Sequence, residues 1–298
     1  MRESELLELI EQRSRDISGR GAVVVGPGDD AAVLDLPGLT LVTVDHLVEG
    51  RHYDASATID QIARKAVARS VSDIAAMGGT PSCALGTGCL HSDFRFADEL
   101  FERMAFWAHH FGCPLAGGDI ATSDHPNVLT VTVIGRAHAV RGPVLRSTAQ
   151  AGDVVCVTGA VGGSLMSGRH LSFEPRIGAA CALCDRLGPA LTAMIDLSDG
   201  LGRDADRVAR ASRVRMALDS SRLPLNSEAG HWRSAAADGE DYELLFCVSG
   251  ERAVPAEVLG VPVTVIGRCA AGGPPGAVFV DENGEETLAR ELGWDHGA

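Results

Sequence analysis

The sequence predicts an α/β fold with two domains. Strand-like and helix-like segments are intermixed along both halves of the chain, which is typical of mixed sheets covered by helices. The 298 residues suit one large or two ordinary domains, and 45% apolar with 22% charged residues predicts a globular chain with a sizeable core. A loop-like stretch, RGPVLRSTAQ at 141–150, lies between the halves. We therefore expect domains at 1–145 and 146–298.

The first elements follow from the spacing of apolar residues. Leu6, Leu7 and Ile10 share one face of a short amphipathic helix. AVVV and LTLVTVDHL, on either side of the GPGDD turn, are predicted strands.

A long helix is predicted over ATIDQIARKAVARSVSDIAAMGG. Thr58 and Gln61 form a capping box at its start, and glycines followed by Pro81 end it. Three basic side chains are expected to point away from its apolar stripe: Arg64, Lys65 and Arg69. Asp73 falls inside that stripe, where a carboxylate is costly unless a cation meets it. Alternatively, Asp73 is an edge residue near a frayed helix end.

The remaining elements alternate in type. A strand near Leu85, a helix from about Ala97 to Phe111 and the strand VLTVTVIGRAH complete the first half. The second half is predicted to contain, in order, VVCVTG (strand), IGAACALCDRL (helix), TAMIDLS (strand), GRDADRVARAS (helix), VRMALD, DYELLFCVS and VPVTVIGRC (strands).

Charge and composition exclude several classes of function. The chain has 40 Asp+Glu against 26 Lys+Arg, which argues against binding a nucleic-acid backbone. No stretch reaches about 18 consecutive apolar residues and the start is charged, so we expect no membrane span and a cytoplasmic location. The eight cysteines include one isolated C-x-x-C pair, which we interpret as reduced thiols packed as small apolar groups.

Acidic turns recur at the ends of apolar runs. They contain Asp29, Asp30, Asp45, Asp73, Asp119, Asp196 and Asp199. Carboxylates beside glycines suit hard divalent cations such as Mg²⁺, which shares its shell with phosphate oxygens, and glycines allow close approach of backbone N–H groups to phosphate. Each turn alone is also explained as ordinary Asx capping.

Competing motifs are absent from the sequence. There is no G-x-x-x-x-G-K-[ST], no protein-kinase catalytic loop and no G-x-S-x-G elbow. GAVGGS at 159–164 lacks a full dinucleotide fingerprint, and we interpret it as a turn after a strand.

An ordered set of motifs runs along nearly the whole chain: GPGDDAAVL, VDHLVEGRHY, ARSVSDIAAMGGTP, AGGDI, LRSTAQAGDVVCVTGAVG, IDLSDGL, GEDYELLF and GWDHG. This set resembles the thiamine-monophosphate kinase family, within the superfamily of aminoimidazole ribonucleotide synthetase and selenophosphate synthetase. The resemblance implies an N-terminal α/β domain whose small sheet pairs across a homodimer, and a C-terminal α/β domain. It also implies phosphorylation of thiamine monophosphate to thiamine diphosphate with ATP and several Mg²⁺ ions.

Site residues are implied by matching these motifs. The implied metal ligands are Asp30, Thr43, Asp45, Asp73, Asp119, Asp196 and Asp199. The implied ATP contacts are Gly118, Asp119, Arg146 and Ser198, and the implied substrate contacts are His52, Glu240 and Trp294. Asp73 and Asp199 are expected to be the catalytic pair among them. The indole of Trp294 could instead simply close the edge of the second domain.

Two departures from the family pattern concern the acceptor. Asp238 stands where the family usually has a glycine beside Glu240, and the segment between GAVGGSLMSG and RHLSFEPR is short. Two other functions are therefore weighed: a related ATP-dependent enzyme with another acceptor, and a nucleotide-binding regulator without turnover. The chain ends in WDHGA and not in a reactive cysteine, which argues against a hydrogenase maturation protein.

Overall fold

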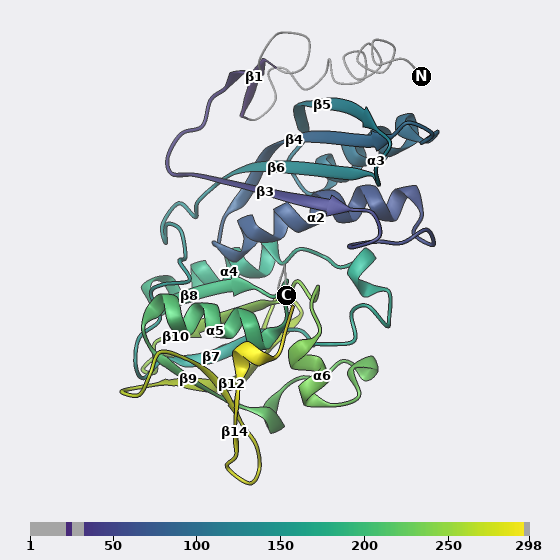
Figure 1. Ribbon diagram of the computed structural model, residues 1–298. Helices are drawn as coiled ribbons and strands as arrows, with labels where there is room; N and C mark the ends of the chain where they lie inside the picture. Colours follow the sequence, from purple (N-terminus) through teal and green to yellow (C-terminus); the bar gives the residue numbers. More distant parts are fainter. Residues whose placement is uncertain (1–21, 26–32, 295–298) are drawn as a thin grey trace. The chain divides into compact units, whose positions relative to one another are not determined.

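The computed structural model describes residues 22–25 and 33–294. The chain divides into two compact units, labelled in Figure 1. The first unit comprises the chain through Ile74 together with Gly79–Ala137, and the second comprises Ala75–Gly78 together with the chain from His138. The predicted α/β class is confirmed, whereas the helix predicted around residues 6–10 lies outside the described residues. Within those residues, no helix combines the length and apolar character needed to cross a bilayer.

A four-stranded sheet forms the centre of the described part of the first unit, in the order β3-β6-β4-β5. Strand β6 runs antiparallel to both neighbours, and β4 runs parallel to β5. A separate antiparallel pair joins β1 to β2. The strands are β1 (Val23–Val25), β2 (Val33–Leu34), β3 (Thr40–Val48), β4 (Thr80–His91), β5 (Leu115–Ser123) and β6 (Val128–Arg136).

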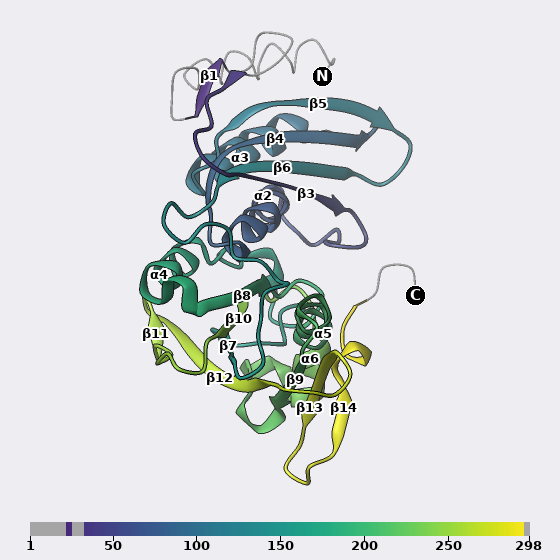
Figure 2. The same cartoon turned by 90° about the vertical axis from the view of Figure 1, so that its left-hand side faces the viewer.

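Two helices cover this sheet: α2 (Ile59–Ala76) and α3 (Ala97–His110). Figure 2 shows both beside the sheet. The predicted capping box is present, because Gln61 N–H donates to Thr58 Oγ1 at 3.2 Å and Thr58 N–H donates to Gln61 Oε1 at 2.9 Å. Ser70 of α2 donates its hydroxyl to the Val131 carbonyl of β6 at 2.8 Å, which joins helix to sheet.

The prediction that the three basic residues of α2 point away was wrong. Arg69 turns towards β3 and donates to the His46 carbonyl at 2.7 Å. Lys65 is fully buried and Arg64 is nearly so. The Lys65 ammonium donates to the His52 carbonyl at 2.6 Å, and the Arg64 guanidinium lies 5.0 Å from the ring centroid of Trp107. Helical periodicity did not predict this, because the acceptors and the aromatic face that receive these charges come from other segments: β3, the loop after β3, and α3.

The described part of the second unit is built on an eight-stranded sheet. Its order is β14-β13-β9-β12-β7-β10-β8, with β11 paired to β12, and all pairs are antiparallel except β13 with β9. The strands are β7 (Val154–Thr158), β8 (Leu191–Asp196), β9 (Arg215–Asp219), β10 (Leu244–Val248), β11 (Glu257–Val258), β12 (Val261–Ala270), β13 (Gly276–Val280) and β14 (Glu286–Leu288).

Helices pack on both faces of this sheet. They are α4 (Ile177–Leu187), α5 (Leu201–Ser212) and α6 (Trp232–Ala237), with short 3₁₀ turns η2 (Arg169–Leu171), η3 (Gly188–Ala190), η4 (Ser220–Arg222), η5 (Ser227–Ala229) and η6 (Ala289–Glu291). Helix α4 packs with the core that contains Phe246, whereas α5 packs with the core that contains Val155 and Leu245. Strands β7, β8 and β10 are therefore buried along their whole length, as their continuous apolar sequences predict.

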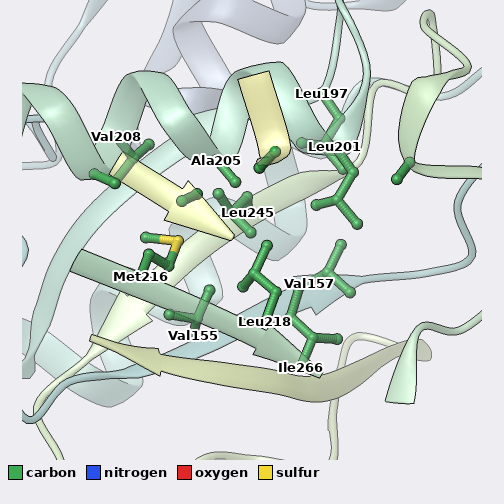
Figure 3. Close-up of a cluster of buried hydrophobic side chains, with 14 of the residues drawn as sticks. Val155, Val157, Leu197, Leu201, Ala205, Val208, Met216, Leu218, Leu245 and Ile266 are labelled. Atoms are coloured by element: carbon green, nitrogen blue, oxygen red, sulfur yellow. The ribbon is translucent and has the colours of Figure 1, made fainter. Parts of the chain in front are cut away.

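The core beneath α5 is shown in Figure 3. Val208 and Ala205 of α5 lie over side chains of the sheet, including Met216 and Leu218. All eight cysteines, each within the described ranges, are free thiols, which confirms the expectation of reduced cysteines.

Candidate active site

The first unit contains an acidic cluster, defined here as Thr43, Asp45 and Asp73. Thr43 and Asp45 are two residues apart on β3, so their side chains leave the same face of the strand. Asp73 is on the last turns of α2, and the Thr43 hydroxyl donates a hydrogen bond to its carboxylate. Asp73 is thus half-buried against β3 and not at a frayed end.

A cation already lies beside this first acidic cluster. The Arg69 guanidinium is 3.8 Å from the Asp45 carboxylate and donates to the His46 carbonyl at 2.7 Å. Arg69 is one helical turn from Asp73, so these two residues of α2 together make three contacts with β3. The side chains of Arg69 and Asp45 are only 12% and 27% exposed, which strengthens their attraction relative to a surface pair.

His52 is fixed in the loop after β3. Its Nδ1 accepts from Val48 N–H at 2.8 Å, so a proton on the neutral ring resides on Nε2. The Lys65 ammonium donates to the His52 carbonyl and so fixes the backbone of this residue. The loop therefore presents an imidazole with a defined donor.

Gly118 and Asp119 are on β5, at the other edge of the sheet. Strands β6 and β4 lie between β3 and β5, so β5 is about 14 Å from β3 at normal strand spacing. Gly118 is required by close packing, because a Cβ there would lie 1.9 Å from the Gly86 carbonyl oxygen. Within one copy of the chain, Asp119 and Asp45 therefore lie on opposite edge strands of the sheet.

The second unit contains another acidic cluster, Asp196, Ser198 and Asp199, in the turn between β8 and α5. Leu197 and Leu201 flank the turn and are fully buried in the core (Figure 3), which anchors its ends. Asp196 ends the buried strand β8 and is 6% exposed.

Asp204 organises this turn and was missed from sequence. Its carboxylate accepts the N–H groups of both Ser198 and Asp199 at 3.0 Å. Burial raises its pKa to about 7, opposed by Arg207. Arg207 bridges Asp204 at 2.7 Å and Asp199 at 2.5 Å. An acid in the first turn of a helix, just after a Ser-Asp-Gly turn, is the signal that could have identified it.

Two predicted substrate contacts are fastened to the same turn. Glu240 N–H donates to the Ser198 carbonyl, and Trp294 N–H donates to the Asp199 carbonyl, each at 2.8 Å. Trp294 is 51% exposed, and its contact with the substrate stays a prediction. The second unit therefore brings Ser198, Asp199, Glu240 and Trp294 together.

Close approach at this turn requires glycine. A Cβ on Gly239 would lie 2.8 Å from the Ser198 carbonyl oxygen, and one on Gly293 would lie 2.6 Å from that of Asp199. These glycines of the GEDYELLF and GWDHG motifs let two distant segments reach the turn.

Asp238 is accommodated without strain. Its φ of −63° and ψ of 131° need no glycine, and its carboxylate accepts Gly163 N–H at 2.8 Å. The neighbouring Gly162 N–H donates to the Asp241 carboxylate at 2.8 Å. The amides of the glycine turn at 162–163 thus donate to carboxylates of the protein itself, which is consistent with a structural turn.

Arg146 lies elsewhere in the second unit. Its carbonyl accepts the hydroxyl of Ser212 at 3.0 Å, at the end of α5. Ser198 precedes the start of α5, which rises roughly 16 Å over its length. The structure does not fasten Arg146 to the turn that carries Ser198, and its contact with ATP stays a prediction.

The donors of both acidic clusters are oxygen atoms, which fit Mg²⁺ in chemical kind. Among the residues that the structure describes, no three acidic, cysteine or histidine side chains are grouped closely enough to hold a metal ion by themselves. Asp30 lies outside the described residues. Within either unit, a complete metal shell would therefore need phosphate oxygens, water or further ligands.

The fold and these clusters define a class of protein. The family model "AIR synthase related protein, N-terminal domain" matches residues 28–137. The structure of hydrogenase maturation protein HypE in complex with ATP has the same fold, with 19% identity, a TM-score of 0.79 and coverage of 97% of this chain and 94% of that chain. The chain thus has the mixed α/β fold of that structure, and its first half matches the AIR synthase related family.

Sequence identity narrows this class. A thiamine-monophosphate kinase of Rhodopirellula baltica is 38% identical over 290 residues, covering 89% of each chain. A structure of AaThiL complexed with AMPPCP and TMP is 28% identical, with a TM-score of 0.74 and coverage of 99% of both chains. The chain belongs to the thiamine-monophosphate kinase family, which confirms the resemblance inferred from the motifs.

Proposed function

We propose that the chain is an enzyme that transfers the terminal phosphoryl group of ATP to thiamine monophosphate, forming thiamine diphosphate and ADP, with Mg²⁺. The observation that carries this proposal is the assembly of Ser198, Asp199, Glu240 and Trp294 around one turn. Family membership supports it, since the AaThiL relative was determined with both an ATP analogue and TMP.

The chemistry needs positioning more than proton transfer. The nucleophile is a phosphate oxygen of the acceptor, which is already anionic near neutral pH, so no general base has to be provided. Bringing anions together is the obstacle, because two unit charges 4 Å apart repel by about 4 kcal/mol at an effective dielectric of 20. Mg²⁺, when bound, would neutralise phosphate oxygens and align donor with acceptor.

Residues of the first unit would act as anionic ligands and as a donor to the substrate. Asp45 and Asp73, with the Thr43 hydroxyl, would hold metal ions from β3 and α2, together with Asp30. His52, with its Nε2 proton, would donate to an acceptor oxygen. The buried Lys65 would help to hold His52 in place through its hydrogen bond to the His52 carbonyl.

Residues of the second unit would align the two substrates. Asp196 and Asp199 would add carboxylates to the metal sites, and Ser198 would contact ATP. Glu240 would meet a polar edge of the thiamine rings. The half-exposed indole of Trp294 offers an aromatic face on which a flat ring stacks.

A homodimer would complete the metal sites. Val42 and Val44 alternate with Thr43 on β3, point away from α2, and are 67% and 57% exposed. Strands β3 and β5 are the sheet edges, and exposed edges favour pairing with another chain. Pairing them between copies would bring Asp119 of the partner subunit towards Asp45.

Mixing two inactive variants tests this dimer. Asp45→Asn and Asp119→Asn are each expected to lose activity, and a refolded mixture should regain part of it, because each mixed dimer holds one intact site. Sedimentation should show a dimer. A monomer, or a mixture with no recovery, would contradict the shared site.

The function is tested by ADP release with Mg-ATP and three acceptors: thiamine monophosphate, thiamine and none. We expect release only with thiamine monophosphate, formation of thiamine diphosphate by mass spectrometry, and no turnover in excess EDTA. Equal ADP release without any acceptor would indicate another reaction, and undiminished ATP affinity in EDTA would contradict the metal role.

A further inference from the structure

Glu240 is held in an unfavourable backbone conformation. Its φ is 63° and that of Tyr242 is 52°, both in the left-handed region that favours glycine. This conformation is unfavourable for a residue with a side chain and persists only when surrounding contacts enforce it. The loop 238–242 therefore needs a structure that holds it.

Hydrogen bonds fix one side of this loop to residues 162–164. Gly162 N–H donates to Asp241 and Gly163 N–H to Asp238, each at 2.8 Å. The Ser164 hydroxyl donates to the Glu240 carbonyl at 2.7 Å. Three successive residues thus bind Asp238, Glu240 and Asp241.

The other side of the loop is fixed to the acidic turn. Glu240 N–H donates to Ser198, and Tyr242 N–H donates to the Leu197 carbonyl at 2.8 Å. A shift of the Glu240 backbone would therefore break its hydrogen bond to the Ser198 carbonyl. The loop connects the proposed acceptor contact with the proposed ATP and metal turn.

A buried ion pair secures this arrangement. The Asp241 side chain is 0% exposed and accepts from the Arg169 guanidinium at 2.6 Å. Arg169 also lies 3.7 Å from Glu243, whose carboxylate is bound by Arg176. Two arginines thus balance two buried carboxylates, and removing one would leave a buried charge unmatched.

We propose that Arg169 and Asp241 are positioning residues for acceptor recognition: through the Gly162 amide and the 238–242 loop, they set where Glu240 stands. This inference rests on the proposed function of Glu240. It assigns a role to the short 164–176 segment. This segment positions Arg169, and its conformation therefore affects the affinity for thiamine monophosphate. Asp238 adds a tether of the same kind.

The test compares three variants with one control. Arg169→Gln and Arg169→Lys change the cation, and Asp238→Gly removes a tether without leaving a buried charge. Arg215→Gln is the control, because Arg215 is similarly exposed (23% against 24%) and pairs with Glu286 on β14, away from the loop. Steady-state kinetics would give KM for each substrate on samples with native circular dichroism.

We expect Arg169→Gln to raise KM for thiamine monophosphate about tenfold or more, with KM for ATP within about twofold. Asp238→Gly should show the same split at severalfold, Arg169→Lys should fall between Arg169→Gln and wild type, and Arg215→Gln should match wild type. Unchanged KM for thiamine monophosphate in both Arg169→Gln and Asp238→Gly would overturn the proposal. So would a parallel rise in both KM values.

Hydrogen exchange separates this proposal from the proposed function. In Arg169→Gln and Asp238→Gly, the amides of residues 162–163 and 240–242 should exchange faster than in wild type, with or without substrate. If the wild-type protein does not turn over thiamine monophosphate, the proposed function is wrong. Faster exchange in the variants would still show that Arg169 and Asp238 hold the 238–242 loop in place. Unchanged exchange in both variants would overturn the positioning role of Arg169 and Asp241, whatever the substrate.

Discussion

The two acidic clusters are built in different ways. In the first unit, Thr43 and Asp45 project from a regular strand and Asp73 from a regular helix, and a hydroxyl joins them. In the second unit, Ser198 and Asp199 are on a turn whose amides are held by the buried carboxylate of Asp204. Regular elements fix side chains through their own backbone hydrogen bonds, whereas a turn needs a dedicated partner.

This difference predicts where each cluster is vulnerable. The first cluster should tolerate loss of a single contact, because β3 and α2 remain packed. The second should lose its geometry when a buried acceptor is removed. Removing a ligand itself should damage either one strongly.

The largest expected effect comes from removing a ligand while keeping the turn. Asp199→Asn keeps the size of the side chain but removes its charge, so kcat should fall by about 10²–10³, as for loss of a well-placed electrostatic stabiliser. Asp185→Asn is the control, because Asp185 is 72% exposed on α4. Near-normal turnover in Asp199→Asn would mean that this turn is only a structural cap.

The next effect contrasts the supports of the two clusters. Asp204→Ala removes the acceptor of two amides and leaves Arg207 facing Asp199 alone, so the free energy of unfolding should fall by about 2–4 kcal/mol. Thr43→Val removes one hydroxyl and should cost about 1 kcal/mol. Urea unfolding measures both, and equal losses would remove the distinction between the clusters.

Sequence patterns predicted much of the fold for physical reasons. The capping box at Thr58, the limits of α3 and the continuous apolar strands of the second unit follow from local propensity and burial, which the chain carries in its own order. The motifs also identified the two turns that meet at Ser198 and Glu240. Those predictions need only short segments and their chemistry.

Tertiary partners determined what the patterns could not predict. Lys65 was placed on the outer face because its carbonyl partner, His52, is thirteen residues away in a loop. Asp204 and Asp241 were missed because their function depends on amides and arginines supplied by other segments. The ligand roles of Arg146 and Asp119 stay predictions, since they depend on ATP, metal or a second copy.

A pH-dependent effect is expected from the titration of Asp241. Burial raises its pKa from 3.8 to about 7, although Arg169 and the Gly162 amide oppose this and Glu243 and Asp238 reinforce it. A carboxyl with a raised folded-state pKa binds protons more tightly when folded, so its contribution lowers the free energy of unfolding as pH rises from about 4 to 7. The slope is at most about 1.4 kcal/mol per pH unit. Asp241→Asn should flatten the pH profile measured by urea unfolding between pH 4.5 and 7, and an identical slope would contradict the shift.

The smallest expected effect concerns Trp294, where the backbone and the side chain have separable roles. Its N–H supports the Asp199 carbonyl, and its indole is half-exposed. Trp294→Ala keeps the N–H and removes only the ring, so KM for thiamine monophosphate should rise severalfold, or about 1–3 kcal/mol at most for one stacked ring, while KM for ATP stays the same. Truncation after Leu292 removes the N–H as well, and should also lower kcat through the turn. If Trp294→Ala lowers the melting temperature and weakens both substrates together, the indole braces the second unit. The acceptor assignment would then rest on Glu240 and His52 alone.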